Sequence, residues 1–241
     1  MKIKLFTIPN LLTLANLLCG SFAAVCALVY GNLTAAFWLV VLAAVFDFLD
    51  GFAARLLKCP SPIGLQLDSL ADVISFGFVP AAVLYVMTSP LADAEVWVRY
   101  AITLVCFAMT AFSALRLAKF NIDETQHTEF CGLPTPANAL FFTSLGLICA
   151  RTGFDSHHLL LLLFLAPVMS WMLVSPVRMF ALKFQGFGWR GNEVRYGFLA
   201  GCVVLIAALR LYSIPAIIVV YILISVVRWI ARCAKGCDLN N

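Results

Sequence analysis

The chain has 241 residues, of which 63% are hydrophobic and 12% are charged, and its formal net charge is +4 at pH 7. Soluble globular domains carry about 25% charged residues, so a mean hydropathy of +0.99 excludes a water-soluble fold for a chain of this length. The composition predicts a polytopic membrane protein, in which lipid covers much of the apolar surface.

Eight apolar stretches follow one another from the N-terminus, and with their polar flanks most reach the roughly 17–25 residues that cross a bilayer. They predict an all-α bundle of about eight transmembrane helices. No polar linker is long enough to separate domains, so residues 1–241 are expected to form one domain. The stretches lie at residues 11–30, 33–46, 73–87, 100–115, 137–150, 159–174, 196–209 and 214–230. The weakest of them are 137–150 and 196–209.

The distribution of basic residues predicts the orientation of the bundle. If the N-terminus and every even-numbered connection lie on one side, only Arg99, Arg151 and Arg210 of the 16 Lys and Arg residues fall on the other side. The positive-inside rule then places both termini in the cytoplasm. The net charge reflects this topology, and no nucleic-acid partner is expected.

Residues 47–72 (DFLDGFAARLLKCPSPIGLQLDSLAD) place four aspartates in an otherwise apolar sequence. At 100° per residue, Asp47 and Asp50 project from one face of a helix. The prolines of the CPSP segment break that helix. A second helix is expected directly afterwards, with Asp68 and Asp72 one turn apart on one stripe. Such a helical hairpin brings the four carboxylates together between its two helices.

These acids require compensation in a membrane protein. A charged residue at a helix centre costs roughly 2.5–3.5 kcal/mol on insertion scales, and Arg55 and Lys58 are too few to neutralise four carboxylates. Clustered carboxylate oxygens suit Mg²⁺ or Mn²⁺, and two ions about 3.5–4 Å apart can hold a phosphoryl group. The sequence therefore predicts a divalent metal site and indicates diphosphate chemistry, without naming a substrate. The predicted ligands are Asp47, Asp50, Asp68 and Asp72.

The spacing D-x2-D-G-x2-A-R-x8-G-x3-D-x3-D resembles the signature of the CDP-alcohol phosphatidyltransferase family. The chain carries all eight of its fixed residues: Asp47, Asp50, Gly51, Ala54, Arg55, Gly64, Asp68 and Asp72. Within the family, segments 6–20, 114–123 and 132–137 are similar to the integral-membrane phosphatidylserine synthases of bacteria and archaea. The resemblance covers most of residues 6–137. It implies a six-helix core, a homodimer, and a multi-pass protein of the cytoplasmic (inner) membrane whose active site faces the cytoplasm.

The resemblance also implies a reaction. The serine hydroxyl would attack the β-phosphorus of CDP-diacylglycerol, giving phosphatidylserine and CMP with the help of Mg²⁺ or Mn²⁺, expected as two ions. Asp72 would be the general base as well as lying near the metals. The residues implied for the CDP group are Gly51, Ala54, Arg55 and Gly64.

The first apolar stretch carries a polar stripe at Asn10, Thr13 and Asn16. Such a stripe either hydrogen-bonds to neighbouring helices or lines a catalytic cavity. We expect Asn10, near the cytoplasmic end, to reach the nucleotide and Thr13 to serve packing.

Serine carries a carboxylate and an ammonium group, so its site needs a cation or amide donors beside an acceptor. Arg116, Lys119 and Asn121 follow the fourth apolar stretch on the cytoplasmic side, and Thr135 lies between two prolines. These four residues are the candidates for the acceptor site. Basic residues at a cytoplasmic helix end also satisfy topology and the helix dipole, so a structural role for Arg116 and Lys119 stays open.

Three alternatives remain on the sequence alone. The acidic signature also fits enzymes whose acceptor is glycerol 3-phosphate, an inositol phosphate or choline, and only segments 114–123 and 132–137 favour serine. Intramembrane prenyltransferases place aspartates around a diphosphate, but in separate hairpins. A cation-coupled transporter is the non-enzymatic alternative; its acids are expected on several spans, whereas here they share one hairpin.

Overall fold

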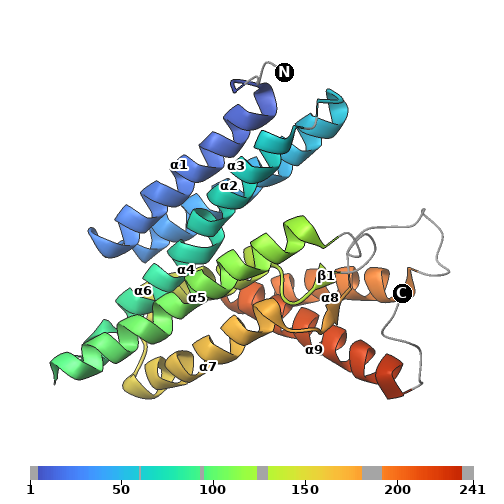
Figure 1. Cartoon of the computed structure of the whole chain (residues 1–241). Helices are drawn as coiled ribbons and strands as arrows, with labels where there is room; N and C mark the ends of the chain where they lie inside the picture. The colour runs from blue at the N-terminus through green and yellow to red at the C-terminus, as the bar shows by residue number, and fades with distance from the viewer. Residues whose placement is uncertain (1–4, 60, 93–94, 124–129, 181–191, 235–241) are drawn as a thin grey trace.

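The computed structural model is almost entirely helical over the residues that it describes (Figure 1), which are 5–59, 61–92, 95–123, 130–180 and 192–234. The first two helices, α1 (Ile8–Leu28) and α2 (Leu33–Leu56), form a hairpin and pack along each other. Both begin at polar caps, because the side chains of Thr7 and Asn32 accept hydrogen bonds from backbone N–H groups of the first turn.

The third span is a continuous helical stretch from Pro62 to Leu91. It is assembled from α3 (Pro62–Asp72), the π-helix η1 (Val73–Phe78), α4 (Val79–Thr88) and the 3₁₀ turn η2 (Ser89–Ala92). The side chain of Ser61 caps its start by accepting a hydrogen bond from the Gly64 N–H at 3.0 Å. The predicted break at CPSP and the new helix after it are therefore confirmed.

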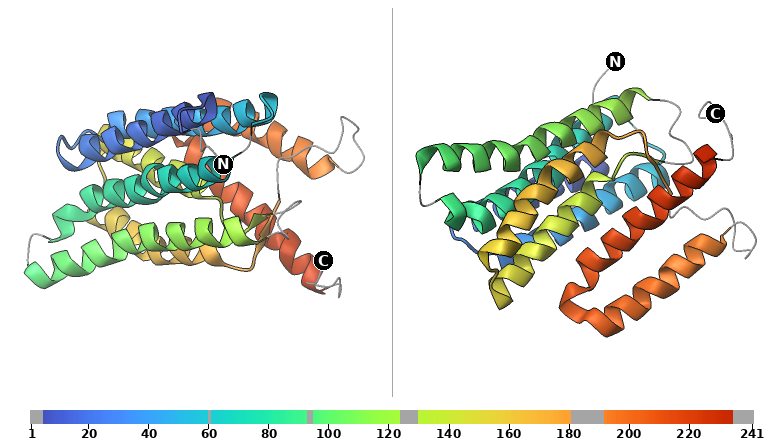
Figure 2. Two further views of the ribbon diagram at one scale, coloured as in Figure 1. Left: turned by 45° about the horizontal axis from the view of Figure 1, so that its top comes forward. Right: turned by 90° about the horizontal axis from the view of Figure 1, so that it is seen from below.

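The remaining helices complete the bundle. They are α5 (Val96–Ile122), α6 (Thr135–Thr152), α7 (Ser156–Val174), α8 (Glu193–Leu209) and α9 (Ser213–Ala234), with the 3₁₀ turn η3 (Arg210–Tyr212) between the last two. Short antiparallel strands, β1 (Phe130–Cys131) and β2 (Arg178–Met179), join the segment before α6 to the segment after α7. Figure 2 shows α8 and α9 as a hairpin beside the other helices.

The protein is an all-α, multi-pass membrane protein, as predicted. Among the described residues, six helical stretches are long and apolar enough to cross a membrane: Ile8–Leu28, Leu33–Leu56, Pro62–Leu91, Val96–Ile122, Ser156–Val174 and Glu193–Ala234. The expected stretches 196–209 and 214–230 both fall in the last of these. The expected stretch 137–150 lies in α6, which is not among the six because its Thr, Asn and Arg residues lower its hydropathy.

The third span occupies the centre of the bundle, since 67% of its most apolar window is buried. Close contacts fix η1 against its neighbours. A Cβ atom on Gly20 of α1 would overlap Ser75, whose Oγ donates a hydrogen bond to the Asn16 carbonyl at 3.1 Å. A Cβ atom on Gly77 would lie 3.0 Å from the Cβ of Ser113 on α5. Small residues thus hold α1 and α5 close to the segment that follows α3.

Candidate functional site

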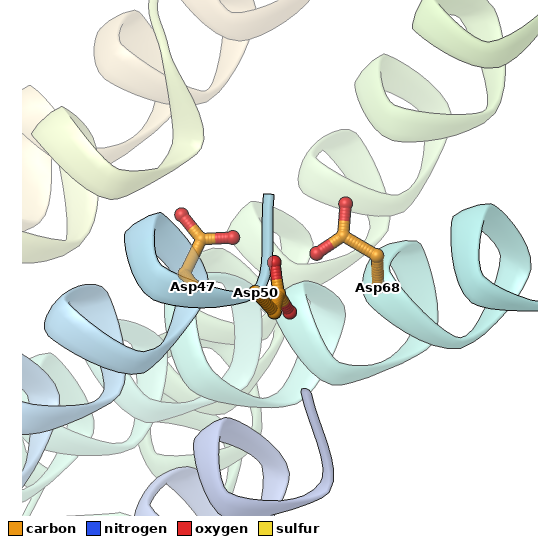
Figure 3. Close-up of side chains that lie close together, drawn as sticks. All are labelled: Asp47, Asp50 and Asp68. Atoms are coloured by element: carbon orange, nitrogen blue, oxygen red, sulfur yellow. The ribbon is translucent and has the colours of Figure 1, made fainter. Parts of the chain in front are cut away.

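Three carboxylates converge between α2 and α3 (Figure 3). Asp47 and Asp50 lie one turn apart on α2, Asp68 lies on α3, and one oxygen atom from each is within 4.8 Å of the others. Asp50 is buried and the other two are partly exposed. The helical hairpin therefore gathers three of the four aspartates into one cluster, which we call the carboxylate cluster.

The fourth aspartate, Asp72, lies one turn beyond Asp68 on α3 and is buried. Its Oδ1 accepts a hydrogen bond from Nδ2 of Asn16 on α1 at 3.2 Å. Asp72 is not part of the 4.8 Å cluster, but it is close enough to Asp47 and Asp68 to interact with them electrostatically. The structure thus places Asp72 beside the carboxylate cluster and fixes one of its oxygens through α1.

The polar stripe of α1 faces this acidic hairpin. Thr13 Oγ1 donates a hydrogen bond to Asp50 Oδ2 at 2.5 Å, and both residues are buried. A hydrogen bond to a charged acceptor is stronger than one between neutral groups, so it restricts the orientation of the Asp50 side chain. Thr13 thus hydrogen-bonds to a neighbouring helix, one of the two roles expected of the stripe, and its hydroxyl positions a carboxylate.

The carboxylate cluster has the properties of a divalent cation site. Among the described residues, no Lys or Arg forms a salt bridge with Asp47, Asp50 or Asp68. The buried Oδ1 of Asp68 has no hydrogen-bond partner. Leaving clustered acids uncompensated in a membrane protein is unfavourable, and a hard cation with carboxylate ligands provides the missing charge. The residues present fit Mg²⁺ or Mn²⁺.

A pocket of about 190 Å³ opens next to the cluster. It is formed where α1, α2 and α3 meet, and its lining includes Asn10, Asp50, Gly51, Ala54, Gly64 and Asp68. Four of the five residues predicted to contact the nucleotide are therefore brought together beside two of the predicted metal ligands. Arg55, the fifth, is exposed and is not part of the lining.

The glycines of the pocket have different surroundings. A Cβ atom on Gly64 would lie 3.0 Å from Ser61 Oγ and 3.2 Å from Asn10 Oδ1, whereas a Cβ atom on Gly51 would meet nothing within 4 Å. A side chain at Gly64 would thus press on the wall of the pocket. One at Gly51 would extend into open space, where a ligand would lie.

The four acceptor candidates separate into different environments. Arg116 and Thr135 are both buried, and Arg116 Nη1 donates a hydrogen bond to Thr135 Oγ1 at 3.2 Å. Asn121 Nδ2 donates to Ser69 Oγ at 2.8 Å, and Ser69 is the residue that directly follows Asp68. Lys119 is exposed. The structure thus brings Arg116 and Thr135 together and leaves Lys119 outside that group.

The sequence reasoning missed one polar residue, Asn138. It lies one turn after Thr135 on α6 and is fully buried. The sequence does contain a signal for this residue, because an amide side chain inside a predicted membrane-spanning stretch is unusual.

Comparison with known proteins agrees with this geometry. A model of the family described as CDP-alcohol phosphatidyltransferase matches residues 6–182, which is well over half of the 241 residues.

Several relatives share the name CDP-diacylglycerol–serine O-phosphatidyltransferase. One from Bacillus subtilis is 34% identical over 132 residues, which cover 54% of this chain and 69% of the relative. One from Helicobacter pylori is 36% identical over 142 residues, covering 56% of this chain and 55% of the relative. One from Methanocaldococcus jannaschii is 38% identical over 138 residues, covering 57% and 59%. For the last two, the match spans less than two thirds of the relative's length.

Proposed function

We propose that this chain, which belongs to the CDP-alcohol phosphatidyltransferase family, transfers the phosphatidyl group of CDP-diacylglycerol to the hydroxyl of L-serine, giving phosphatidylserine and CMP. The observation that carries the proposal is the meeting of the carboxylate cluster with the small-residue pocket on one membrane-embedded hairpin. The names of the relatives support serine as the acceptor.

Different residues around the hairpin would bind the metal and the nucleotide. Asp47, Asp50 and Asp68 would hold Mg²⁺ or Mn²⁺, expected as two ions, which when bound supply positive charge to the diphosphate oxygens. The pocket would take the CDP group, with Asn10, Gly51, Ala54 and Gly64 against it and Arg55 at its exposed edge. Thr13 keeps Asp50 turned toward the cluster.

Asp72 is the proposed general base. The Asn16 N–H occupies Asp72 Oδ1, which leaves Oδ2 to take the proton of the serine hydroxyl. The serine oxygen then bonds to the β-phosphorus, the bond from that phosphorus to the bridging oxygen breaks, and CMP leaves with the electron pair. A base held in one orientation makes this proton transfer more effective.

The membrane placement is part of the proposal. We expect the hairpin to lie at the cytoplasmic side of the cell membrane, because the positive-inside rule places the basic connections there. The resemblance to the family supports a homodimer and a single domain over the chain.

The test is acceptor specificity with purified protein in lipid vesicles. CDP-diacylglycerol and Mn²⁺ are supplied with labelled L-serine, glycerol 3-phosphate, inositol phosphate or choline. Of the four acceptors, we expect only L-serine to give CMP release and a labelled lipid. Transfer to another acceptor, and none to serine, would reassign the enzyme within its family, whereas no CMP release with any acceptor would reject the proposal.

Replacement of Gly64 tests the pocket. We expect Gly64→Val to raise KM for CDP-diacylglycerol by about 10-fold, because overpacking a filled site costs about 1–3 kcal/mol and the new side chain presses on Ser61 and Asn10. Gly197→Val on α8, where a Cβ atom meets nothing within 4 Å, is the control and should leave KM unchanged. An unaltered KM in Gly64→Val would place the nucleotide elsewhere.

A further inference from the structure

Asn138 on α6 is a buried polar side chain without a partner. The residue is 0% exposed, and neither Nδ2 nor Oδ1 forms a hydrogen bond. Buried amides are nearly always paired, since an unpaired one loses its hydrogen bonds to water and gains none in return. The amide of Asn138 therefore lacks a partner that a polar ligand can supply.

The guanidinium of Arg116 contacts the same end of α6 and also has an unpartnered nitrogen. Its Nη1 donates a hydrogen bond at 3.2 Å to the hydroxyl of Thr135. Thr135 lies one turn before Asn138 on the same side of α6. Arg116 is only 8% exposed, and its Nε has no partner. No described carboxylate forms a salt bridge with it. The guanidinium therefore has a free donor at Nε that can bind an anion.

Arg116 and α6 lie close to Asp72, the proposed general base. Arg116 is close enough to Asp72 to interact with it electrostatically. Both α5 and α6 pack against η1, the segment that starts directly after Asp72. Thr135 and Asn138 also lie in the first turns of α6, where the helix dipole favours a negatively charged group.

We propose that Arg116, Thr135 and Asn138 form the acceptor subsite and that Asn138 selects a zwitterionic amino acid with a β-hydroxyl group; this inference rests on the proposed function. The carboxylate of the acceptor accepts hydrogen bonds from Arg116 Nε and Asn138 Nδ2. Its ammonium group donates to Asn138 Oδ1, since an amide offers both a donor and an acceptor. The hydroxyl is then directed to Asp72.

The first test replaces the amide by an apolar side chain of similar size. Asn138→Leu is expected to raise KM for L-serine by about 10–100-fold, the effect of losing hydrogen bonds to charged groups, with KM for CDP-diacylglycerol unchanged. The melting temperature without substrates is expected to stay equal or rise, because an unpaired amide has been removed. A fall in melting temperature together with equal increases in both KM values would show a structural role and overturn the inference.

The control lies on the same helix. Thr143 is also fully buried, but its hydroxyl is satisfied by the Ala139 carbonyl at 2.7 Å. Thr143→Val should change neither KM value. An equal rise of the serine KM in both variants would show that any polar loss from α6 has this effect, and would contradict a specific role of Asn138.

The second test varies the acceptor. Wild-type protein should discriminate against serinol, which lacks the carboxylate, and against 3-hydroxypropionate, which lacks the ammonium group. In Asn138→Leu the discrimination against 3-hydroxypropionate should shrink by about 10-fold or more, because the partner of the ammonium group is gone. Unchanged discrimination in the variant, with an active wild type, would overturn the subsite alone. A wild type that releases no CMP with L-serine would instead reject the proposed function, and the subsite with it.

Discussion

Asp72→Asn is expected to lower kcat for CMP release by about 10²–10⁴-fold, the usual contribution of a general base. The amide has nearly the same shape, but it cannot take the proton of the acceptor. CDP-diacylglycerol should still bind in the presence of Mn²⁺, because the carboxylate cluster does not include Asp72. Single-turnover CMP release and separate binding measurements check the two statements.

The matched control for this variant is Asp155→Asn. That carboxylate precedes α7, and its side chain is 87% exposed, so neither kcat nor lipid binding should change. Full turnover by Asp72→Asn would remove Asp72 from the role of base. Loss of CDP-diacylglycerol binding in that variant would instead assign Asp72 to the metal site.

The second large effect concerns the carboxylate cluster itself. Asp68→Asn is expected to weaken Mn²⁺ binding by more than about 100-fold, since even residues that only support a metal ligand contribute 10–100-fold. Activity should be lost with it. Without metal, the variant should melt at an equal or higher temperature than the wild type, because one of three like charges within 4.8 Å has been removed.

Electron paramagnetic resonance of free Mn²⁺ and thermal unfolding with and without metal measure these effects. The wild type should gain stability from Mn²⁺, as any ligand of the folded state confers, and Asp68→Asn should not. Gln66→Ala, an exposed change two residues away on the same helix, should behave like the wild type. Equal Mn²⁺ titrations for Asp68→Asn and wild type would contradict the assignment of Asp68 as a ligand.

The helical hairpin was predictable because its determinants are local. The three- and four-residue spacings of the aspartates specify the faces, the prolines of the CPSP segment specify the break, and the structure shows both. The small residues Gly51, Ala54 and Gly64 were assigned to the pocket by resemblance, and they line it. Each of the eight apolar stretches likewise falls in a helix of the described structure.

The contacts of α1 were less predictable. Asn16 meets Asp72 across 56 residues of sequence, and Thr13 meets Asp50 across 37. Helical periodicity shows that a stripe shares one face, but it does not show which helix that face contacts. Packing of Gly20 against Ser75 decides this, and such a close approach leaves no periodic pattern in the sequence.

Two of the acceptor candidates differ in burial, which the sequence does not show. Arg116 and Lys119 lie one turn apart on α5, and the sequence treats them alike. Arg116 is buried against Thr135, whereas Lys119, nearer the end of the helix at Ile122, is exposed. The burial of α6, which is not among the six apolar spans, could not be predicted from hydropathy either, nor could the unpaired amide of Asn138.

The central claim is that the carboxylates of α2 and α3 hold divalent cations and that these cations hold the diphosphate. Calorimetric titration of CDP into the purified protein, once with Mn²⁺ and once with EDTA, tests it most directly. We expect binding with Mn²⁺, none with EDTA, and none by Asp68→Asn in either condition. CDP binding of equal strength with Mn²⁺ and with EDTA would contradict the account.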